Sequence, residues 1–129
     1  LPRVDFWSLD ADPAQVKYGA KNHLIATLQS VDQHFPPRDL DLIVCNGVFG
    51  YGLNSAADLR LAMLHCFSCL RPGGELMLGW NDVPAFAPFD PCTEIEKVGF
   101  VRADLSPLGR WRTVLNMPTR HTFEAYRRP

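Results

Sequence analysis

Two apolar runs with strand character flank a segment of helical character in the middle of the chain, and this alternation limits the possible folds. Residues 40–45, with Ile and Val, and residues 75–80 are predicted to be strands. Between them apolar residues recur at helical spacing, as Leu59, Ala62, Met63, Cys66, Phe67 and Leu70. Ser55 and Asp58 predict a capped helix start, and the Pro-Gly-Gly at 72–74 predicts its end. Such a unit favours a parallel sheet with a right-handed crossover.

The preceding part of the chain continues the alternation. Residues 4–9 are rich in β-branched and aromatic side chains and predict a strand, which the acids and proline at 10–13 end. A short helix is expected over 13–20. Residues 23–28 fit either one face of a helix or a short strand, and local pattern leaves both open.

The C-terminal part predicts a short helix over 93–98 and strands over 100–105 and 121–127. The connection between these strands carries Pro107 and Pro118 and is expected to be long and irregular. Because no helix separates the last two strands, one of them should be antiparallel to the rest.

The 129 residues have the length and the 47% hydrophobic content of one globular domain, residues 1–129, with an α/β fold. Helices are expected on the faces of the sheet, with the strand at 40–45 buried on both faces. A net charge of −1 argues against a nucleic-acid partner, and no apolar run reaches the length of a membrane span. The four cysteines fit reduced core thiols rather than a metal site, and we expect a cytoplasmic protein.

Ligands in open sheets of this kind bind beyond the carboxyl ends of the strands. Three loops therefore hold the candidate site residues, which are Asp10 and Asp12, then Asn46, Gly47, Val48, Phe49 and Tyr51, then Trp80, Asn81 and Asp82. A carboxylate after the first strand is able to accept both hydroxyls of a ribose, whereas the alternative is that Asp12 only caps the next helix. The glycines after Asn46 either let the backbone pass close to a ligand or serve a tight turn. Trp80 either walls a substrate pocket or packs in the core.

The block from Asp41 to Phe49, followed by Leu-Arg-Pro-Gly-Gly at 70–74 and the strand up to Trp80, resembles the fourth strand, next helix and fifth strand of class I S-adenosylmethionine-dependent methyltransferases. The segment 7–13 is similar to their second strand and its ribose-binding acid, and 100–127 to their sixth and seventh strands. The resemblance implies a Rossmann-like, mostly parallel sheet with an antiparallel C-terminal strand. It also favours a strand for 23–28.

The same resemblance implies S-adenosylmethionine as cofactor. Asp10, with Asp12, would face the ribose, and Asn46, Gly47, Val48 and Phe49 would border the methionine moiety and the acceptor. Tyr51, Trp80, Asn81 and Asp82 would face a small-molecule substrate. No catalytic residue and no metal ligand is implied.

The family's first strand and its glycine-rich loop have no counterpart before Val4, and the chain begins at Leu1 rather than Met. We therefore expect a form that has lost an N-terminal segment. The strand order 3-2-1-4-5-7-6 of the family would lose its central member, and open strand edges there are costly. The gap is expected to close, either through pairing of the second strand with the fourth or through a neighbouring chain.

Three functions follow from these expectations. The chain is a methyltransferase-like domain with weak or no cofactor binding, or a working methyltransferase whose missing element comes from elsewhere. The third alternative is a non-catalytic module, a dimer or other homo-oligomer, that uses the vacated sheet surface to bind a partner.

Overall fold

The computed structural model describes residues 3–104 and 109–129. In chain order, the elements are β1 (Trp7–Asp10), the 3-10 helix η1 (Pro13–Tyr18), β2 (Asn22–Ile25), the 3-10 helix η2 (Leu28–Gln33), β3 (Leu40–Asn46), α1 (Ala56–Cys69), β4 (Leu70–Asn81), α2 (Pro91–Val98), β5 (Val101–Arg102), β6 (Arg112–Val114) and β7 (His121–Arg127). Within the two described ranges, no helix is long and apolar enough to cross a membrane.

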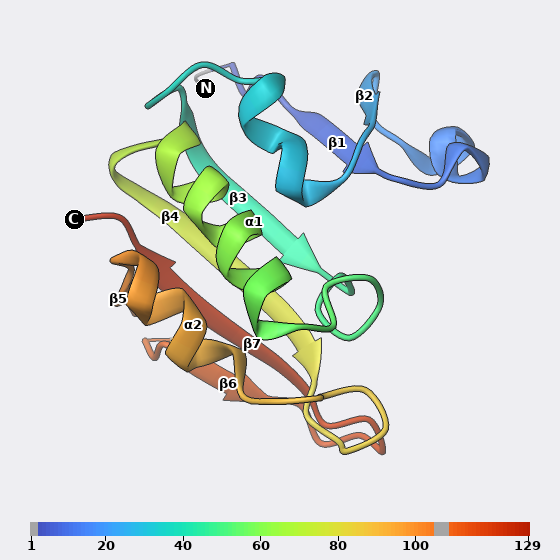
Figure 1. Ribbon diagram of the computed structural model, residues 1–129, viewed down its shortest axis with the longest axis vertical. Coiled ribbons are helices and arrows are strands. Elements are labelled where there is room, and N and C mark those ends of the chain that lie inside the picture. Colours follow the sequence, from blue (N-terminus) through green and yellow to red (C-terminus); the bar gives the residue numbers. More distant parts are fainter. Residues whose placement is uncertain (1–2, 105–108) are drawn as a thin grey trace.

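The main sheet has the order β3-β4-β7-β5, and β6 also pairs with β7 (Figure 1). β3 and β4 are parallel, with Cys45 opposite Leu78, and β7 runs antiparallel to β4. These pairings confirm the parallel strands predicted at 40–45 and 75–80 and the antiparallel strand at the C-terminal end.

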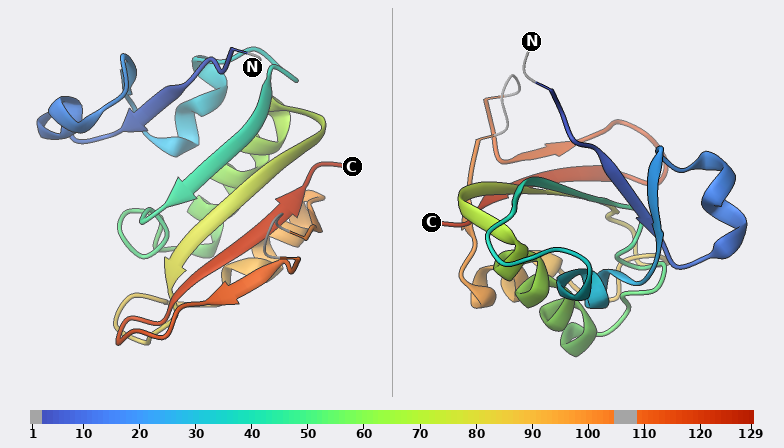
Figure 2. Two further views of the ribbon diagram at one scale, coloured as in Figure 1. Left: turned by 180° about the vertical axis from the view of Figure 1, so that it is seen from behind. Right: turned by 90° about the horizontal axis from the view of Figure 1, so that it is seen from above.

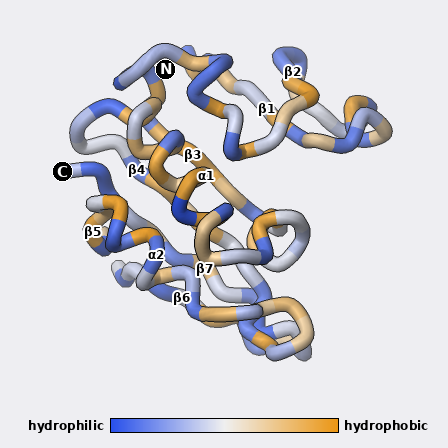
Figure 3. The backbone as a smooth tube through the Cα atoms, viewed as in Figure 1, coloured by the Kyte–Doolittle hydropathy of each residue, from blue (hydrophilic) through white to orange (hydrophobic). Residues whose placement is uncertain are grey.

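Helix α1 forms over most of the apolar stripe that the sequence predicts and contributes one face to the core. It ends at Cys69, so the prediction that Pro-Gly-Gly at 72–74 ends the helix was wrong, and these residues lie within β4. The Ser55 side chain accepts a hydrogen bond from the backbone N–H of Asp58 at 3.1 Å, which satisfies one free donor at the helix start. The buried face of the helix consists of Leu59, Ala62, Met63, Cys66 and Cys69. It lies in one cluster with Leu76 and Leu78 of β4, so the sheet and α1 share a single core. Figure 3 shows hydrophobic residues along β3, β4 and α1.

The helices cover one face of the main sheet only, which corrects the expectation of helices on both faces. Figure 2 shows α1 and α2 on the same side, with the other side of β3 and β4 free of helices. Ile43 and Cys45 point into the core, whereas Leu42 and Val44 are 55% and 53% exposed. The prediction that β3 is buried on both faces was therefore wrong. A continuous apolar run suits a two-sided core, but within residues 3–104 and 109–129 no crossover helix covers the second face of β3.

The gap between β1 and β3 is not closed by strand pairing, which is a second correction. β1 pairs in parallel with β2 in a separate two-stranded sheet, and the main sheet ends at β3. Trp7 packs edge-on against Phe35, with ring centroids 5.7 Å apart. The aromatic contact links β1 to the segment before β3, and Figure 1 shows β1 and β3 apart.

Several boundaries differ from the sequence-based expectations. The strand predicted at 4–9 is β1, which begins at Trp7 and runs to Asp10. Residues 23–28 contain the strand that the resemblance favoured, and the helical pattern belongs to η2 just after it. The helix predicted at 93–98 begins at Pro91, because Asp90 caps it through the backbone N–H of Cys92.

At the C-terminal end, only Val101–Arg102 of the strand predicted at 100–105 pairs with β7, and Leu105 lies outside the described residues. Strand β6 was not predicted. It lies in the connection that the prolines led us to expect to be irregular, and its pairing partner β7 follows it after a turn. The short strands β5 and β6 form through their pairing with β7, so the local sequence pattern does not predict them.

Candidate functional site

The strands β1, β3 and β4 point their carboxyl ends toward the same side of the molecule in both views (Figures 1 and 2). They end at Asp10, Asn46 and Asn81. Ligands of open α/β sheets bind beyond this edge. The three loops selected from the sequence therefore face the same side of the fold.

The loop after β1 is organised by its own acids. The Asp10 carboxylate accepts a hydrogen bond from the backbone N–H of Asp12 at 2.9 Å. Asp12 in turn accepts from the backbone N–H of Ala14 at 2.9 Å and so caps η1. Asp12 thus has the structural role named as its alternative, and the second carboxylate oxygen of Asp10 has no partner among the described residues.

A hydrogen-bonded network joins the ends of β3, β4 and β7. His121 Nε2 lies 2.9 Å from Asn46 Oδ1, and His121 Nδ1 lies 2.7 Å from Asn81 Oδ1. Asn81 Nδ2 donates to the Tyr51 hydroxyl at 2.8 Å. A Cβ at Gly79 would overlap the Asn46 side chain, so this position needs glycine for the network to form. Three of the predicted residues are thereby brought together.

His121 was not among the predicted site residues. It is 75 positions from Asn46 and 40 from Asn81, and no sequence spacing connects them. Only the antiparallel pairing of β7 with β4, which places His121 opposite Asn81, brings the imidazole to this edge.

The loop after β3 turns back on itself and is anchored in the core. Gly47 has a φ of 71° and Gly50 a φ of 86°, both in the region that favours glycine. Phe49 is fully buried, with Trp80 and Phe89 packed edge-on around it. Val48 is half-buried against the same core. Of the predicted loop residues, Asn46, Gly47 and Tyr51 are exposed.

Tyr51 stacks on Phe86 of the loop that follows β4, with ring centroids 5.3 Å apart and an interplanar angle of 19°. The backbone N–H of Tyr51 donates to the carbonyl of Val48 at 2.9 Å. The two loops at the ligand edge therefore support each other.

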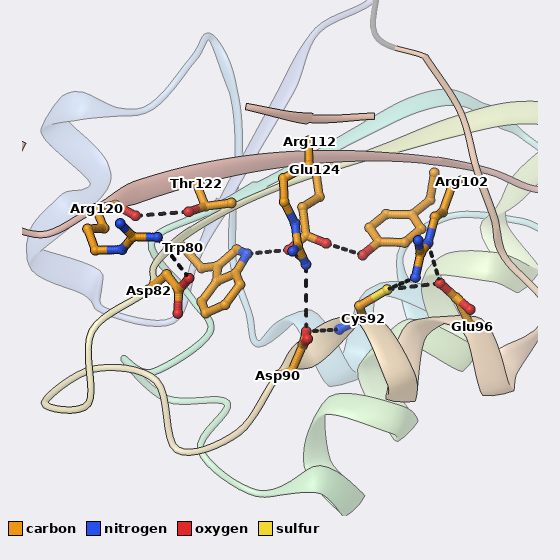
Figure 4. Close-up of polar contacts among 11 residues, drawn as sticks. Trp80, Asp82, Asp90, Cys92, Glu96, Arg102, Arg112, Arg120, Thr122 and Glu124 are labelled. Atoms are coloured by element: carbon orange, nitrogen blue, oxygen red, sulfur yellow. Dashed lines mark hydrogen bonds and ion pairs between the residues drawn. The ribbon is translucent and has the colours of Figure 1, made fainter. Parts of the chain in front are cut away.

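Trp80 points to the face opposite to Asn81 because neighbouring side chains alternate along a strand. It is 3% exposed, and its Nε1 donates to Glu124 Oε1 at 2.5 Å (Figure 4). Glu124 is fully buried and also accepts from the Tyr126 hydroxyl, while Arg112 Nη2 lies 3.5 Å away. Burial raises the pKa of the Tyr126 phenol, and the nearby Glu124 raises it further.

A cavity of about 340 Å³ lies beside Trp80, under the loop after β4. Asp82 is at its rim, 3.8 Å from Arg120, and Asp90 and Arg112 form another part of its wall. A larger and more open cavity of about 480 Å³ shares Asp90 and Arg112 and extends along α2. The predicted residues Trp80 and Asp82 thus line a cavity, whereas Asn81 belongs to the network on the other face.

The larger cavity is lined by polar side chains that hydrogen-bond to one another. Cys92 Sγ donates to Glu96 Oε1 at 2.9 Å, and Arg102 Nε donates to the same oxygen at 2.7 Å. Burial raises the pKa of the Cys92 thiol, and its hydrogen bond to Glu96 raises it further. Hydrogen bonds from Cys92 and Arg102 lower the pKa of the Glu96 carboxyl. The thiol therefore stays protonated at neutral pH, which makes it a poor nucleophile.

Neither a protein-family model nor a curated protein sequence matches the chain. Solved structures do match. A TehB-like SAM-dependent methyltransferase from Corynebacterium glutamicum has a TM-score of 0.69 at 19% identity, over 95% of this chain and 67% of its own. The N-methyltransferase NodS from Bradyrhizobium japonicum, in complex with S-adenosyl-l-homocysteine, has a TM-score of 0.66 at 18% identity, over 95% of this chain and 66% of its own.

A third match is the 1,6-didemethyltoxoflavin-N1-methyltransferase from Burkholderia thailandensis, with a TM-score of 0.67 at 12% identity. The match covers 95% of this chain and 60% of that one, so this chain spans about two thirds or less of all three proteins. This chain has the fold of a class I methyltransferase. The order β3-β4-β7-β5 of the main sheet corresponds to strands 4-5-7-6 of the methyltransferase fold.

The pair β1-β2 corresponds to strands 2 and 3 of the methyltransferase fold. The sequence resemblance therefore predicted the strand arrangement of the main sheet correctly. Among the described residues no strand lies between β1 and β3, where the methyltransferase fold has its first strand. The strands on both sides of this gap, β1 and β3, keep the carboxyl ends beyond which ligands bind.

Proposed function

We propose that the chain is an S-adenosylmethionine-dependent methyltransferase-like domain that binds its cofactor weakly when alone. The observation that carries the proposal is the placement of Asp10 and Asn46 at the carboxyl ends of β1 and β3, in a fold shared with methyltransferases. Two of the solved relatives hold S-adenosylhomocysteine. The domain would act on a small-molecule substrate.

The residues present fit part of the cofactor. Asp10 has a carboxylate oxygen left to accept ribose hydroxyls, because only one of its oxygens is used by Asp12. At Gly47 a Cβ would meet nothing within 4 Å, so open space lies beside the backbone of Gly47. Asn46, Gly47 and Val48 would border the methionine moiety, whereas Phe49 is fully buried and would only support this loop from the core.

Weak binding is expected because the site is divided. β1 and β3 do not pair, and the loop that would run between them over the cofactor has no counterpart in the described residues. Within the described part of the chain, the two halves of the site are positioned through the packing of η2 on α1 and the Trp7–Phe35 contact. Holding them in register for a ligand costs conformational entropy that lowers the affinity.

The domain is proposed to work in the cytoplasm. All four cysteines are buried free thiols, and burial raises the pKa of Cys45 to about 12. Buried unpaired thiols suit a reducing compartment.

Titration with S-adenosylmethionine, followed by NMR chemical shifts and calorimetry, tests the proposal. We expect saturable binding with a dissociation constant of about 1 mM, which corresponds to roughly −4 kcal/mol. Asp10→Ala should weaken the binding about tenfold, as for a lost charge-assisted hydrogen bond. Asp5→Ala, at an exposed acid before β1, is the matched control and should leave it unchanged. Absence of saturable shifts would refute the function, and micromolar one-to-one binding would refute the divided site.

Self-association is a second candidate function, and the free edge of β3 favours it. Among the described strands, β3 pairs with β4 alone, and Leu42 and Val44 beside its other edge are more than half exposed. Free strand edges with apolar side chains pair readily with other chains. We propose that two copies associate through β3 to form a homo-oligomer.

Light scattering with graded protein concentration checks this. The wild type should show a mass above that of one chain, and Val44→Lys should shift the protein to monomer. Leu64→Lys on α1 is the control, because Leu64 is 51% exposed and Val44 is 53% exposed. A wild type that stays monomeric at high concentration would exclude association through β3.

A further inference from the structure

The cavity of about 340 Å³ beside Trp80 combines an apolar wall with loosely paired charges. Its apolar wall is made of Trp80, Val83, Pro84, Ala87 and Phe89. The volume lies at the lower end of the range for small-molecule sites, so the cavity suits a ligand about the size of one substituted aromatic ring.

The two carboxylates at this cavity lack close cationic partners. Asp82 is 3.8 Å from Arg120, and Asp90 is 4.0 Å from Arg112. Both distances exceed those of charge-assisted hydrogen bonds, which are about 2.7–2.9 Å. One oxygen of Asp90 caps α2, but its side chain is still 60% exposed. Oxygen acceptors on both carboxylates are therefore free for N–H donors of a ligand.

Arg112 is held in place but is not saturated with hydrogen bonds. Its guanidinium lies over the Trp111 ring, 4.6 Å from the centroid, and its buried Nε has no hydrogen-bond partner among the residues that the structure describes. The nearest carboxylate, Glu124, is 3.5 Å from Nη2 and is already bound by Trp80 and Tyr126 (Figure 4).

The charges around the cavity disfavour an anion. Two carboxylates, Asp82 and Asp90, and one guanidinium, that of Arg112, line it, so one carboxylate is in excess. Glu124 faces the guanidinium of Arg112 from the buried side and offsets the attraction that this group would have for an anionic ligand. A group that donates hydrogen bonds to Asp82 or Asp90 is favoured over one that accepts them.

We infer that this cavity binds a small amine that carries an aromatic ring, in its neutral or cationic form, and discriminates against carboxylates that carry the same ring. The ring would lie against the apolar wall, and the amine would donate to Asp90 or Asp82. The preference for an amine over a carboxylate is independent of the proposed function. A role of this amine as the methyl acceptor rests on the proposed function.

Isosteric probes test the preference without the cofactor. We would titrate ¹⁵N-labelled protein with benzylamine, benzyl alcohol and benzoate and follow the indole N–H signal of Trp80. Benzylamine should bind roughly tenfold more tightly than benzoate, because each partly exposed carboxylate contributes up to about a fivefold preference. Benzyl alcohol should fall between the two.

Two variants separate charge from cavity shape. Asp90→Asn keeps an effective helix cap and should reduce the benzylamine preference about threefold. Asp5→Asn removes the same charge far from the cavity and should leave the preference unchanged. Ala87→Leu should weaken all three probes by filling the cavity, whereas Ala57→Leu at an exposed site on α1 should not.

The inference is overturned if benzoate binds as tightly as benzylamine, if Asp90→Asn leaves the ratio unchanged, or if no probe shifts the Trp80 signal at tens of millimolar. The S-adenosylmethionine titration is independent of these results. If benzylamine binds but S-adenosylmethionine does not, the proposed function is refuted and this inference is retained. If S-adenosylmethionine binds but benzylamine shows no preference over benzoate, this inference is refuted and the proposed function is retained.

Discussion

Glu124→Ala is expected to lower the free energy of unfolding by about 3–5 kcal/mol, a large share of the stability of a small domain. The fully buried carboxylate accepts hydrogen bonds from Trp80 Nε1 and the Tyr126 hydroxyl and faces Arg112. Truncation would leave two buried donors and one guanidinium without their acceptor and would also open a void. Urea unfolding followed by tryptophan fluorescence measures the loss.

Glu124→Gln is the matched variant for this prediction. Its carbonyl oxygen still accepts from Trp80, and its amide donates to the Tyr126 oxygen, so about 1–2 kcal/mol is expected to be lost. Glu75→Ala, on β4 but on the helix-free face, serves as a control for removal of a glutamate from the sheet and should cost less than 1 kcal/mol. A Glu124→Ala protein as stable as the control would contradict the role given to this carboxylate.

Gly50→Ala is expected to cost about 3 kcal/mol and to separate the two loops at the ligand edge. Gly50 has a φ of 86°, and a Cβ there would overlap the carbonyl oxygen of Phe86, which is backbone and has no rotamer to escape into. The loop after β3 would have to shift, and the stacking of Tyr51 on Phe86 would be lost.

Gly47→Ala is a close comparison for Gly50→Ala. It has a similar φ of 71°, but a Cβ would meet nothing within 4 Å, so only the backbone strain of about 1 kcal/mol is expected. The unfolding free energies of the two variants, together with the chemical shifts of Phe86, test the difference. Equal losses in the free energy of unfolding would show that the overlap with Phe86 does not contribute to the effect of Gly50→Ala. Because the loop after β4 borders the cavity beside Trp80, Gly50→Ala should also weaken benzylamine binding.

The central unit of the fold was predictable because its signals are local. The apolar runs of β3 and β4, the stripe of α1 and the cap at Ser55 each lie within a few residues of one another in the chain. The ligand edge was likewise predictable, since the carboxyl ends of parallel strands share one side. The sequence alone therefore places Asp10, Asn46 and Asp82 at this edge of the sheet.

The failed predictions concern contacts between distant segments. Nothing local to residues 40–45 reveals that only one face of β3 is covered, because this depends on where α1, α2 and η2 pack. Similarly, β1 pairs with β2 and not with β3, and no local pattern in residues 4–9 determines which strand becomes its neighbour.

Periodicity and capping act over short distances in the chain, so they were sufficient to predict the α/β alternation, the parallel β3–β4 pair and the edge of the sheet where the candidate residues lie. The position of His121 between Asn46 and Asn81, and those of Glu124 and Arg112 beside Trp80, follow from the folded structure alone. These groups meet through the register of β7 against β4, and a register between strands some 40 residues apart is set by the packing of the whole core.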